Sequence, residues 1–361
     1  MESTSRTTAD ATLKPAPHHR AVIGNAANFW LHGSRTGFDL THPSSPSSKP
    51  SYPRIRLQTT TTPITLSPAK AALVIIDMQN FFLSEAFGRA RGPGHAASDQ
   101  LLKCAIPAAR KAGIQIVWLN WGLDDEDIEN MPPAVKRAFG FEAVVDEEDE
   151  DDIDGENPEP NGISGTTDAF AKQPPGIAVD KNEDARRQNG PKLNEMGKDK
   201  RIYKGLGSPC GMITLPSGER VDAGRLLMRD TWNAALYPPL QAAYQEGSEL
   251  SHNPDVWIHK DRMSGMWGAR TACQDFLEAK GIRTLLFTGV NTDQCVSGTL
   301  TDAFCKGYDC VLLRDGCGTT SPSFARECVE FNAGRTWGFV ASCENLVEGV
   351  EGMDMGNIDA T

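Results

Sequence analysis

The sequence lacks the features that mark several common protein classes. It has no run of about 18 apolar residues, so we expect no membrane-spanning segment. Its N-terminus lacks the apolar core of a secretory signal. Its nine cysteines, an odd number, include no Cys-x-x-Cys pair, which favours reduced thiols over a disulfide framework or a zinc site. These absences together predict a cytoplasmic protein without a membrane partner.

Positive charge is also scarce. The chain has 36 Lys and Arg residues against 48 Asp and Glu residues, a net charge of −12, which argues against a nucleic-acid partner. Ten of the acidic residues lie within residues 142–156, where no basic residue occurs. The whole segment from about 140 to 205 is acidic or polar and too poor in apolar residues to build a core. We interpret it as a surface insertion.

Composition also divides the rest of the chain. Residues 1–70 are rich in Pro, Ser and Thr and carry little periodic pattern, so we expect an N-terminal extension that is partly disordered or forms an arm. We predict one domain over residues 71–347, interrupted by the insertion. Residues 348–361 are expected to form a C-terminal tail.

Short apolar runs alternate with helical patterns over residues 71–347. The runs predict strands at residues 73–77, 114–120, 255–260, 285–290, 310–315 and 338–342. The helical patterns cover residues 98–113, with Ser98 as the N-cap, and residues 231–244, 269–279, 294–304 and 323–333. Residues 212–228 predict a hairpin. The alternation predicts an α/β fold, a doubly wound (Rossmann-like) three-layer sandwich with an approximately six-stranded, mainly parallel sheet.

Three chemically complementary residues stand at predicted strand ends. Asp77 and Lys260 each end a strand, and Cys295 starts the helix after another strand. Because ligands bind beyond the carboxyl ends of parallel strands, we expect the three side chains to share one site. The helix start and an ammonium group would favour a thiolate at Cys295. Each residue alone also has an ordinary explanation, as a buried cysteine, a helix-capping aspartate or a solvated lysine.

Three segments resemble the signature motifs of the isochorismatase-like cysteine hydrolases: residues 73–80, 259–267 and 288–296. The resemblance covers residues 71–120 and about 230–347 in order. Within the family, residues 117–121, 264–265 and 331–342 are most similar to the ureidoacrylate amidohydrolases. The resemblance implies that Cys295 is the nucleophile, Asp77 the base and Lys260 the cation that stabilises the thiolate.

The resemblance also implies a turn and a pocket. A cis peptide is expected between Val290 and Asn291, and the backbone N–H of Gln294 or Cys295 is expected to hold an oxyanion. Polar and aromatic residues beside the motifs are candidates for the pocket wall, although core packing also explains the aromatic ones. These residues are Asn80, Phe81, Asn120, Trp121, Trp232, Met263 and Trp267. Met263 stands where the ureidoacrylate enzymes have an aromatic residue, which predicts a different pocket.

Metal ligands are not expected. Nicotinamidases of the superfamily carry an Asp-x-His pair and a further His after the second strand, whereas residues 121–127 here contain no histidine. We therefore predict no metal and no cofactor. Asp124, Asp125 and Asp127 could attract a hard cation, but a solvated acidic loop explains them better.

The sequence thus predicts a cysteine-dependent amidohydrolase that cleaves a C–N bond of a small amide, ureide or carbamoyl compound through a thioester. The alternatives are an isochorismatase-type vinyl ether hydrolase, or a non-catalytic or redox member that recruits partners through its acidic insertion. The resemblance also implies a homo-oligomer, either a dimer or a tetramer.

Overall fold

The computed structural model describes residues 18–140 and 205–356. The predicted acidic insertion, at about 140–205, therefore lies almost wholly outside the described residues, as do the first 17 residues. In the described part of the chain, no helix has the length and apolar character needed to cross a membrane.

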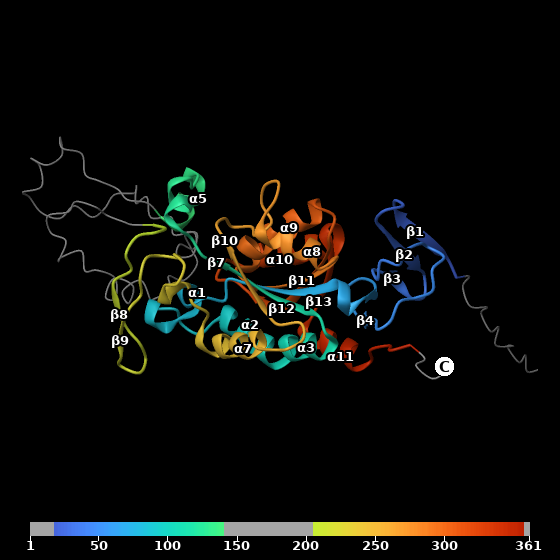
Figure 1. Ribbon diagram of the computed structural model, residues 1–361, viewed down its shortest axis with the longest axis horizontal. Helices are drawn as coiled ribbons and strands as arrows, with labels where there is room; N and C mark the ends of the chain where they lie inside the picture. The colour runs from blue at the N-terminus through green and yellow to red at the C-terminus, as the bar shows by residue number, and fades with distance from the viewer. Residues whose placement is uncertain (1–17, 141–204, 357–361) are drawn as a thin grey trace, which may run out of the picture.

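A six-stranded sheet forms the centre of the molecule (Figure 1). Its strands run in the order β10-β7-β6-β11-β12-β13, and every neighbouring pair is parallel. The predicted α/β, doubly wound fold class is thus confirmed. The strands are β6 (Ala71–Ile76), β7 (Gln115–Trp121), β10 (Val256–Lys260), β11 (Thr284–Val290), β12 (Asp309–Gly318) and β13 (Gly338–Ala341).

Helices cover both faces of this sheet (Figure 1). One face carries α2 (Pro93–Gln100), α3 (Ile106–Ala112), α7 (Pro238–Ser248) and α11 (Cys343–Glu351). The other carries α8 (Ala272–Ala279), α9 (Ser297–Cys305) and α10 (Ser323–Asn332). Successive residues of β6 point to opposite faces, so Leu73 joins the first apolar cluster and Val74 the second. Complete burial of β6 explains why its sequence is a continuous apolar run.

Two helix starts differ from the prediction. Ser98 does not cap a helix; it is buried within α2, which begins at Pro93, and a π-helical turn (η3, Leu101–Ala105) joins α2 to α3. Proline fits the first turn of a helix because its missing N–H would be unpaired there anyway. For the same reason α7 begins at Pro238 rather than near residue 231, after a short 3₁₀ turn (η6, Trp232–Ala234).

The described part of the predicted extension forms a second sheet. Its strands run in the order β1-β2-β3-β5-β4 and are β1 (Arg20–Gly24), β2 (Phe29–Gly33), β3 (Gly37–Asp39), β4 (Ile55–Leu57) and β5 (Ile64–Leu66). Four side chains of β4 and β5 are fully buried in the cluster that contains Leu73 and Leu346: Ile55, Leu57, Ile64 and Leu66. Trp30 donates its indole N–H to Asp309 at 2.7 Å. These strands, which the sequence reasoning did not assign, therefore pack on the main domain.

The remaining elements lie between the main strands. Strands β8 (Met212–Thr214) and β9 (Arg220–Asp222) pair antiparallel, which confirms the predicted hairpin. The hairpin lies at the end of the molecule opposite β1–β4 (Figure 1). The short helices are α1 (Asn80–Leu83), α4 (Asp125–Glu129) and α5 (Pro133–Phe139), with 3₁₀ turns η1 (Pro68–Lys70) and η2 (Glu85–Phe87). Helix α11 crosses the boundary predicted at residue 347.

Replacing Leu57 tests whether β4 belongs to the core. Leu57→Ala should lower the free energy of unfolding by about 2–5 kcal/mol, because it removes a fully buried side chain and leaves a cavity. Arg56→Ala on the same strand is the control and should change it by less than about 0.5 kcal/mol, because Arg56 is exposed. Urea unfolding measures both. Equal effects would show that β4 does not contribute to the core.

Candidate active site

The strand order determines where a ligand site is expected. From β6 the chain moves outward to β7 and β10, and from β11 it moves the other way to β12 and β13. In an open parallel sheet, ligands bind in the crevice beyond the carboxyl ends of the strands at such a reversal. Asp77 follows β6 directly, and Cys295 lies in a π-helical turn (η7, Thr292–Val296) after β11. Both residues therefore lie at the reversal.

Asp77 is the centre of a buried cluster of three side chains. Its Oδ2 atom lies 2.9 Å from Nζ of Lys260, and both side chains are almost completely buried. The thiol of Cys295 lies close enough to the same carboxyl group for each to shift the pKa of the other, while, apart from the ion pair, Oδ2 of Asp77 has no hydrogen-bond partner in the described part of the chain. The structure thus brings together the carboxylate, the ammonium group and the thiol that the sequence placed at three strand ends.

Trp121, at the end of β7, contacts all three members of the cluster. Its backbone N–H donates to Oδ1 of Asp77 at 3.0 Å. Nζ of Lys260 lies 4.0 Å from the centre of its ring, a cation–π contact. Its buried indole N–H has no oxygen or nitrogen acceptor in the described part of the chain and favours the anionic form of the Cys295 sulfur. Trp121 therefore stabilises charge on each of its three neighbours.

The backbone of the site has three unusual positions. Asp77 has a φ of 54°, in the left-handed region that residues other than glycine rarely occupy. Gly289 has a φ of 114°, and a Cβ atom there would lie 2.0 Å from the carbonyl oxygen of Ile76. Only glycine therefore lets β11 approach the end of β6 so closely. The peptide bond between Val290 and Asn291 is cis, as the resemblance implied.

Burial dominates the electrostatics of Cys295. It raises the pKa of the thiol to about 12, while Lys260 acts in the opposite direction. Lys260 therefore favours the thiolate, as predicted, but the cost of removing the charge from water is larger, so the thiol is the stable form in the free site. Burial alone also raises the pKa of Cys273 to about 12. Contact with Asp77 and Lys260, rather than its pKa, distinguishes Cys295.

Asp77 and Cys295 hold one proton between them. Burial raises the pKa of Asp77, against the opposing effects of Lys260, Cys295 and the Trp121 N–H. With Lys260 charged, the cluster is neutral when a single proton is shared by the carboxyl group and the thiol. Low-dielectric surroundings oppose any departure from neutrality. A thiolate can therefore form by proton transfer within the cluster, without loss of a proton to solvent.

The turn before Cys295 has fixed hydrogen bonds. Nδ2 of Asn291 donates to Oε1 of Gln294 at 3.1 Å, and the backbone N–H of Gln294 donates to the carbonyl oxygen of Asn291 at 3.0 Å. Val290 is buried in the core. Since the Gln294 N–H is already engaged, the Cys295 N–H is the remaining candidate of the two predicted oxyanion donors.

Some predicted pocket residues lie next to the segments that carry the cluster. Asn80 opens α1, three residues after Asp77, and donates to the carbonyl oxygen of Trp232 at 2.9 Å. Its buried Oδ1 atom has no hydrogen-bond partner among residues 18–140 and 205–356, so it can accept an N–H from a ligand. Phe81 and Met263 are half-buried at the edge of the second apolar cluster, which also contains Cys295.

Two predicted pocket residues are not brought to the cluster. Asn120 precedes Trp121 on β7 and therefore points to the opposite sheet face, that of Trp118. Trp267 lies at the surface, 40% exposed, where it donates to Asp261 at 2.9 Å and stacks with Arg262. Neither makes a hydrogen bond or ring contact with the cluster in the described structure.

Sequence reasoning missed Gln79 as a positioning residue. Its buried Nε2 donates to the carbonyl oxygens of Trp121 at 2.7 Å and Ala234 at 2.6 Å. It therefore joins the turn after β6 to the end of β7. The sequence signal for this role was a glutamine two residues after Asp77, which itself ends an apolar run. A polar side chain buried at such a position needs hydrogen-bond partners.

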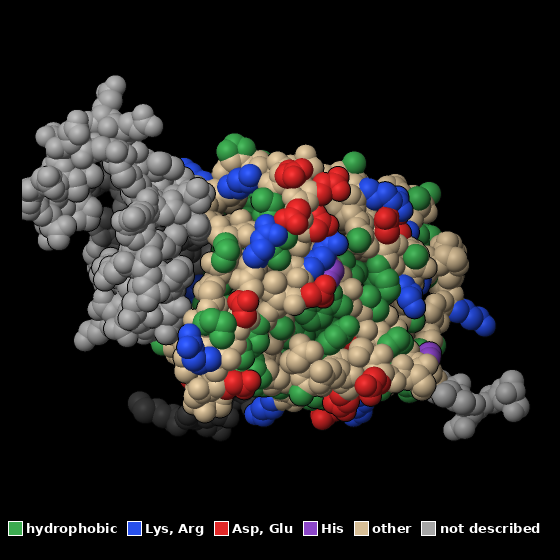
Figure 2. Space-filling view, turned by 60° about the vertical axis from the view of Figure 1, so that its left-hand side comes forward, with side chains coloured by type: hydrophobic (Ala, Val, Ile, Leu, Met, Phe, Trp, Pro, Cys, Tyr) green, Lys and Arg blue, Asp and Glu red, His purple; other side chains and the backbone are tan. Residues whose placement is uncertain are grey.

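The acidic residues after β7 are paired with arginines. Asp125 accepts from Arg225 at 2.7 Å, and Asp124 and Asp127 lie 3.3 and 3.6 Å from Arg229. Among the residues that the structure describes, no three His, Cys, Asp or Glu side chains group as metal ligands do. Figure 2 brings this end of the molecule forward and shows hydrophobic side chains near its centre, surrounded by charges of both signs.

A family model for the isochorismatase domain matches residues 214–330, which include Lys260 and Cys295. Residues 214–330 are thus similar to isochorismatase domains. The ureidoacrylate amidohydrolase of Enterobacter sp. strain 638 is 26% identical over 292 residues, which is 80% of this chain and 92% of that protein. The same enzyme from Rhizobium rhizogenes is 25% identical over 291 residues, 79% of this chain and 85% of that protein.

Solved structures are similar at lower identity. A nicotinamidase from Bacillus subtilis is 16% identical, with a TM-score of 0.45 over 76% of this chain and 99% of that chain. An isochorismatase family protein from Desulfovibrio vulgaris is also 16% identical, with a TM-score of 0.45; the match covers 77% of this chain and 97% of that chain.

A substitution at Gly289 tests the close approach of β11 to β6. Gly289→Ala should lower the free energy of unfolding by more than about 3 kcal/mol and reduce activity, because its Cβ atom meets the Ile76 carbonyl. Gly113→Ala, at another glycine of positive φ (75°) but with open space around it, should cost only about 1–2 kcal/mol. Equal destabilisation of the two variants would contradict the steric argument.

Proposed function

We propose that the isochorismatase-like domain is a cysteine-dependent amidohydrolase, which cleaves a C–N bond of a small amide, ureide or carbamoyl compound through a thioester. The observation that carries this proposal is the buried carboxyl group of Asp77, in contact with both the Cys295 thiol and the Lys260 ammonium group. A nucleophile beside its base is the arrangement that covalent catalysis requires. The similarity to proteins named amidohydrolases supports the choice of a C–N bond.

The first half-reaction forms the thioester. The Cys295 proton moves to Asp77, and the sulfur attacks the substrate carbonyl carbon, so that the carbonyl electron pair moves to the oxygen. The backbone N–H of Cys295 would donate a hydrogen bond to this oxyanion. When the tetrahedral intermediate collapses, the C–N bond breaks and Asp77 gives its proton to the leaving nitrogen. Lys260 stays charged and balances the negative charge as it moves between Asp77, sulfur and oxygen.

The second half-reaction releases the acid. Water gives a proton to Asp77 while its oxygen attacks the thioester carbonyl. The C–S bond then breaks, and the proton returns from Asp77 to the sulfur. The free amide oxygen of Asn80, three residues from Asp77, would suit an N–H group of the substrate.

The alternative functions fit the site less well. Vinyl ether hydrolysis does not require a covalent nucleophile, so it leaves the contact between Cys295 and Asp77 unexplained. A peroxide sensor needs an accessible thiol of low pKa, whereas Cys295 is buried and its pKa is raised. The dimer or tetramer implied by the resemblance stays a prediction.

Replacing Cys295 tests the covalent mechanism. With a small amide or ureide found by screening for ammonia release, Cys295→Ala and Cys295→Ser should each lose at least about a thousandfold in kcat/KM, because the nucleophile is removed. Cys305→Ser is the control and should retain activity, since Cys305 is an exposed thiol. Mass spectrometry of the wild type during turnover should find the acyl group on Cys295.

Continued amide hydrolysis by Cys295→Ser at more than about a tenth of the wild-type rate would contradict the thioester. Vinyl ether hydrolysis that is unchanged in Cys295→Ala would support the alternative activity.

The pH dependence of kcat/KM tests the shared proton. Activity requires an ionised Asp77, and burial raises its pKa above the ordinary value, so activity should fall as the pH drops, with a midpoint above about 4. Because the pKa of Cys295 is raised to about 12, no alkaline loss from the cluster should occur below about pH 10. Circular dichroism at each pH separates titration from unfolding. A loss of activity centred near pH 8 in folded protein would contradict this assignment.

A further inference from the structure

A cavity lies at the other end of the strands that lead to Asp77 and Cys295. It has a volume of about 330 Å³, within the range of small-ligand sites. Lys70 directly precedes β6 and Arg283 directly precedes β11, and both line this cavity. The cavity thus lies at the amino ends of β6 and β11, a strand length away from the candidate active site.

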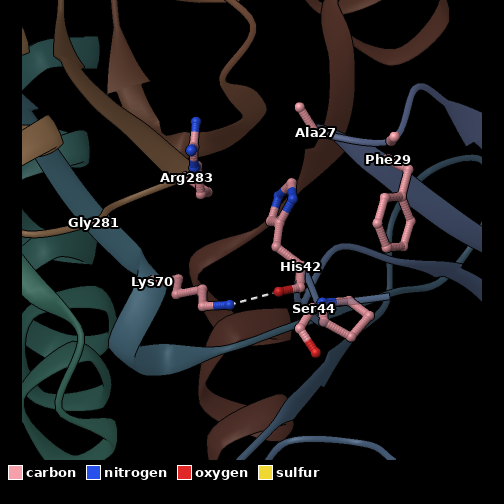
Figure 3. Close-up of a pocket in the computed structure, with 9 residues that line it drawn as sticks. Ala27, Phe29, His42, Ser44, Lys70, Gly281 and Arg283 are labelled. Atoms are coloured by element: carbon pink, nitrogen blue, oxygen red, sulfur yellow. Dashed lines mark hydrogen bonds between the residues drawn. The ribbon is translucent and has the colours of Figure 1, made fainter. Parts of the chain in front are cut away.

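The two walls of the cavity differ in chemistry (Figure 3). Lys70, Gly281 and Arg283 come from the main domain. The opposite wall comes from the N-terminal sheet, including the loop that follows β3. That wall presents the apolar side chains of Ala27, Phe29 and Pro43, together with His42 and the hydroxyl group of Ser44. One wall is therefore cationic and the other mainly apolar.

The two cations of the first wall have no carboxylate partner in the described part of the chain. Arg283 makes no ion pair or side-chain hydrogen bond there. Nζ of Lys70 donates to the carbonyl oxygens of Thr41 at 3.1 Å and His42 at 2.6 Å, which leaves one of its three N–H donors. Burial and the neighbouring Arg283 lower the pKa of Lys70. Two like charges beside a cavity are a destabilising arrangement that a bound anion would relieve.

The carboxylate that contacts His42 of the cavity wall has other partners as well. Asp309 accepts from the indole N–H of Trp30 at 2.7 Å and from the hydroxyl group of Thr284 at 2.9 Å. Nε2 of His42 lies 2.6 Å from its Oδ2 atom, so Asp309 also fixes the His42 ring at the cavity wall. The Asp309 oxygens are thus taken up by these three partners, and Asp309 makes no ion pair with Lys70 or Arg283 in the described part of the chain.

We propose that this cavity binds a small organic anion, whose phosphate or carboxylate group lies between Lys70 and Arg283 and whose apolar body contacts Ala27 and Pro43. Charge-assisted hydrogen bonds from lysine and arginine are the usual means of holding both groups. The apolar wall and the volume of the cavity favour an organic ligand over a bare inorganic ion. The proposal is independent of the function of the active site.

Calorimetric titration of the full chain tests this proposal with three aromatic probes of similar size. Phenyl phosphate, benzoate or both should bind, and the stronger of the two identifies the group preferred. Benzyl alcohol, which is neutral, should not bind. Arg283→Gln should weaken binding at least about tenfold, because it removes a charge-assisted contact without breaking any side-chain bond.

Lys280→Gln is the matched control. It removes the same charge three residues away, from a side chain that lies over Phe276 outside the cavity, and should leave binding unchanged. Binding should also persist in Cys295→Ser, which separates this cavity from the active site. Failure of both anions to bind at about 10 mM, equal binding of benzyl alcohol, or equal losses in Arg283→Gln and Lys280→Gln would each overturn the proposal.

Discussion

The buried ion pair between Asp77 and Lys260 is the contact on which the rest of the site depends. Removing two charges from water costs several kcal/mol per ion, and the cost is offset only when every remaining polar atom is well paired. The Trp121 backbone N–H donates to Oδ1 of Asp77, while the Trp121 ring and the Arg262 carbonyl contact Lys260. Apart from the ion pair itself, Oδ2 of Asp77 has no hydrogen-bond partner in the described part of the chain. Such a pair is a poor way to stabilise a fold. Its position beside the Cys295 thiol suits it to chemistry instead, because the buried, neutral cluster can pass one proton between Cys295 and Asp77.

The order of the strands explains why the cation is a lysine. Asp77 and Cys295 follow the neighbouring strands β6 and β11, so short side chains are enough to bring them into contact. Lys260 ends β10, which is separated from β6 by β7, at a spacing of about 4.8 Å per strand. Only a long cationic side chain reaches across the end of β7, and the Trp121 ring beneath it supports that path. The cluster is therefore a direct product of the doubly wound topology.

The same two central strands connect the candidate active site to the cavity beside Lys70 and Arg283. Lys70 and Asp77 bracket β6, and Arg283 lies before β11 as Cys295 lies after it. The N-terminal sheet makes this cavity possible, because without the loop after β3 the cationic ends of β6 and β11 would face solvent. Its strands β4 and β5 are also part of the main apolar cluster, so the wall opposite Lys70 and Arg283 belongs to the packed structure.

The sequence by itself determined the parallel sheet and the three residues of the cluster. Strands buried on both faces must be continuous apolar runs, and Asp77, Lys260 and Cys295 stand where those runs end. Only the tertiary structure decided the strand order, the second sheet and the protonation of Cys295. The strands of the second sheet have three to five residues, too few to show a period, and gain their burial from distant contacts. The pKa of Cys295 likewise depends on burial by surrounding segments, which outweighs the opposing effect of Lys260.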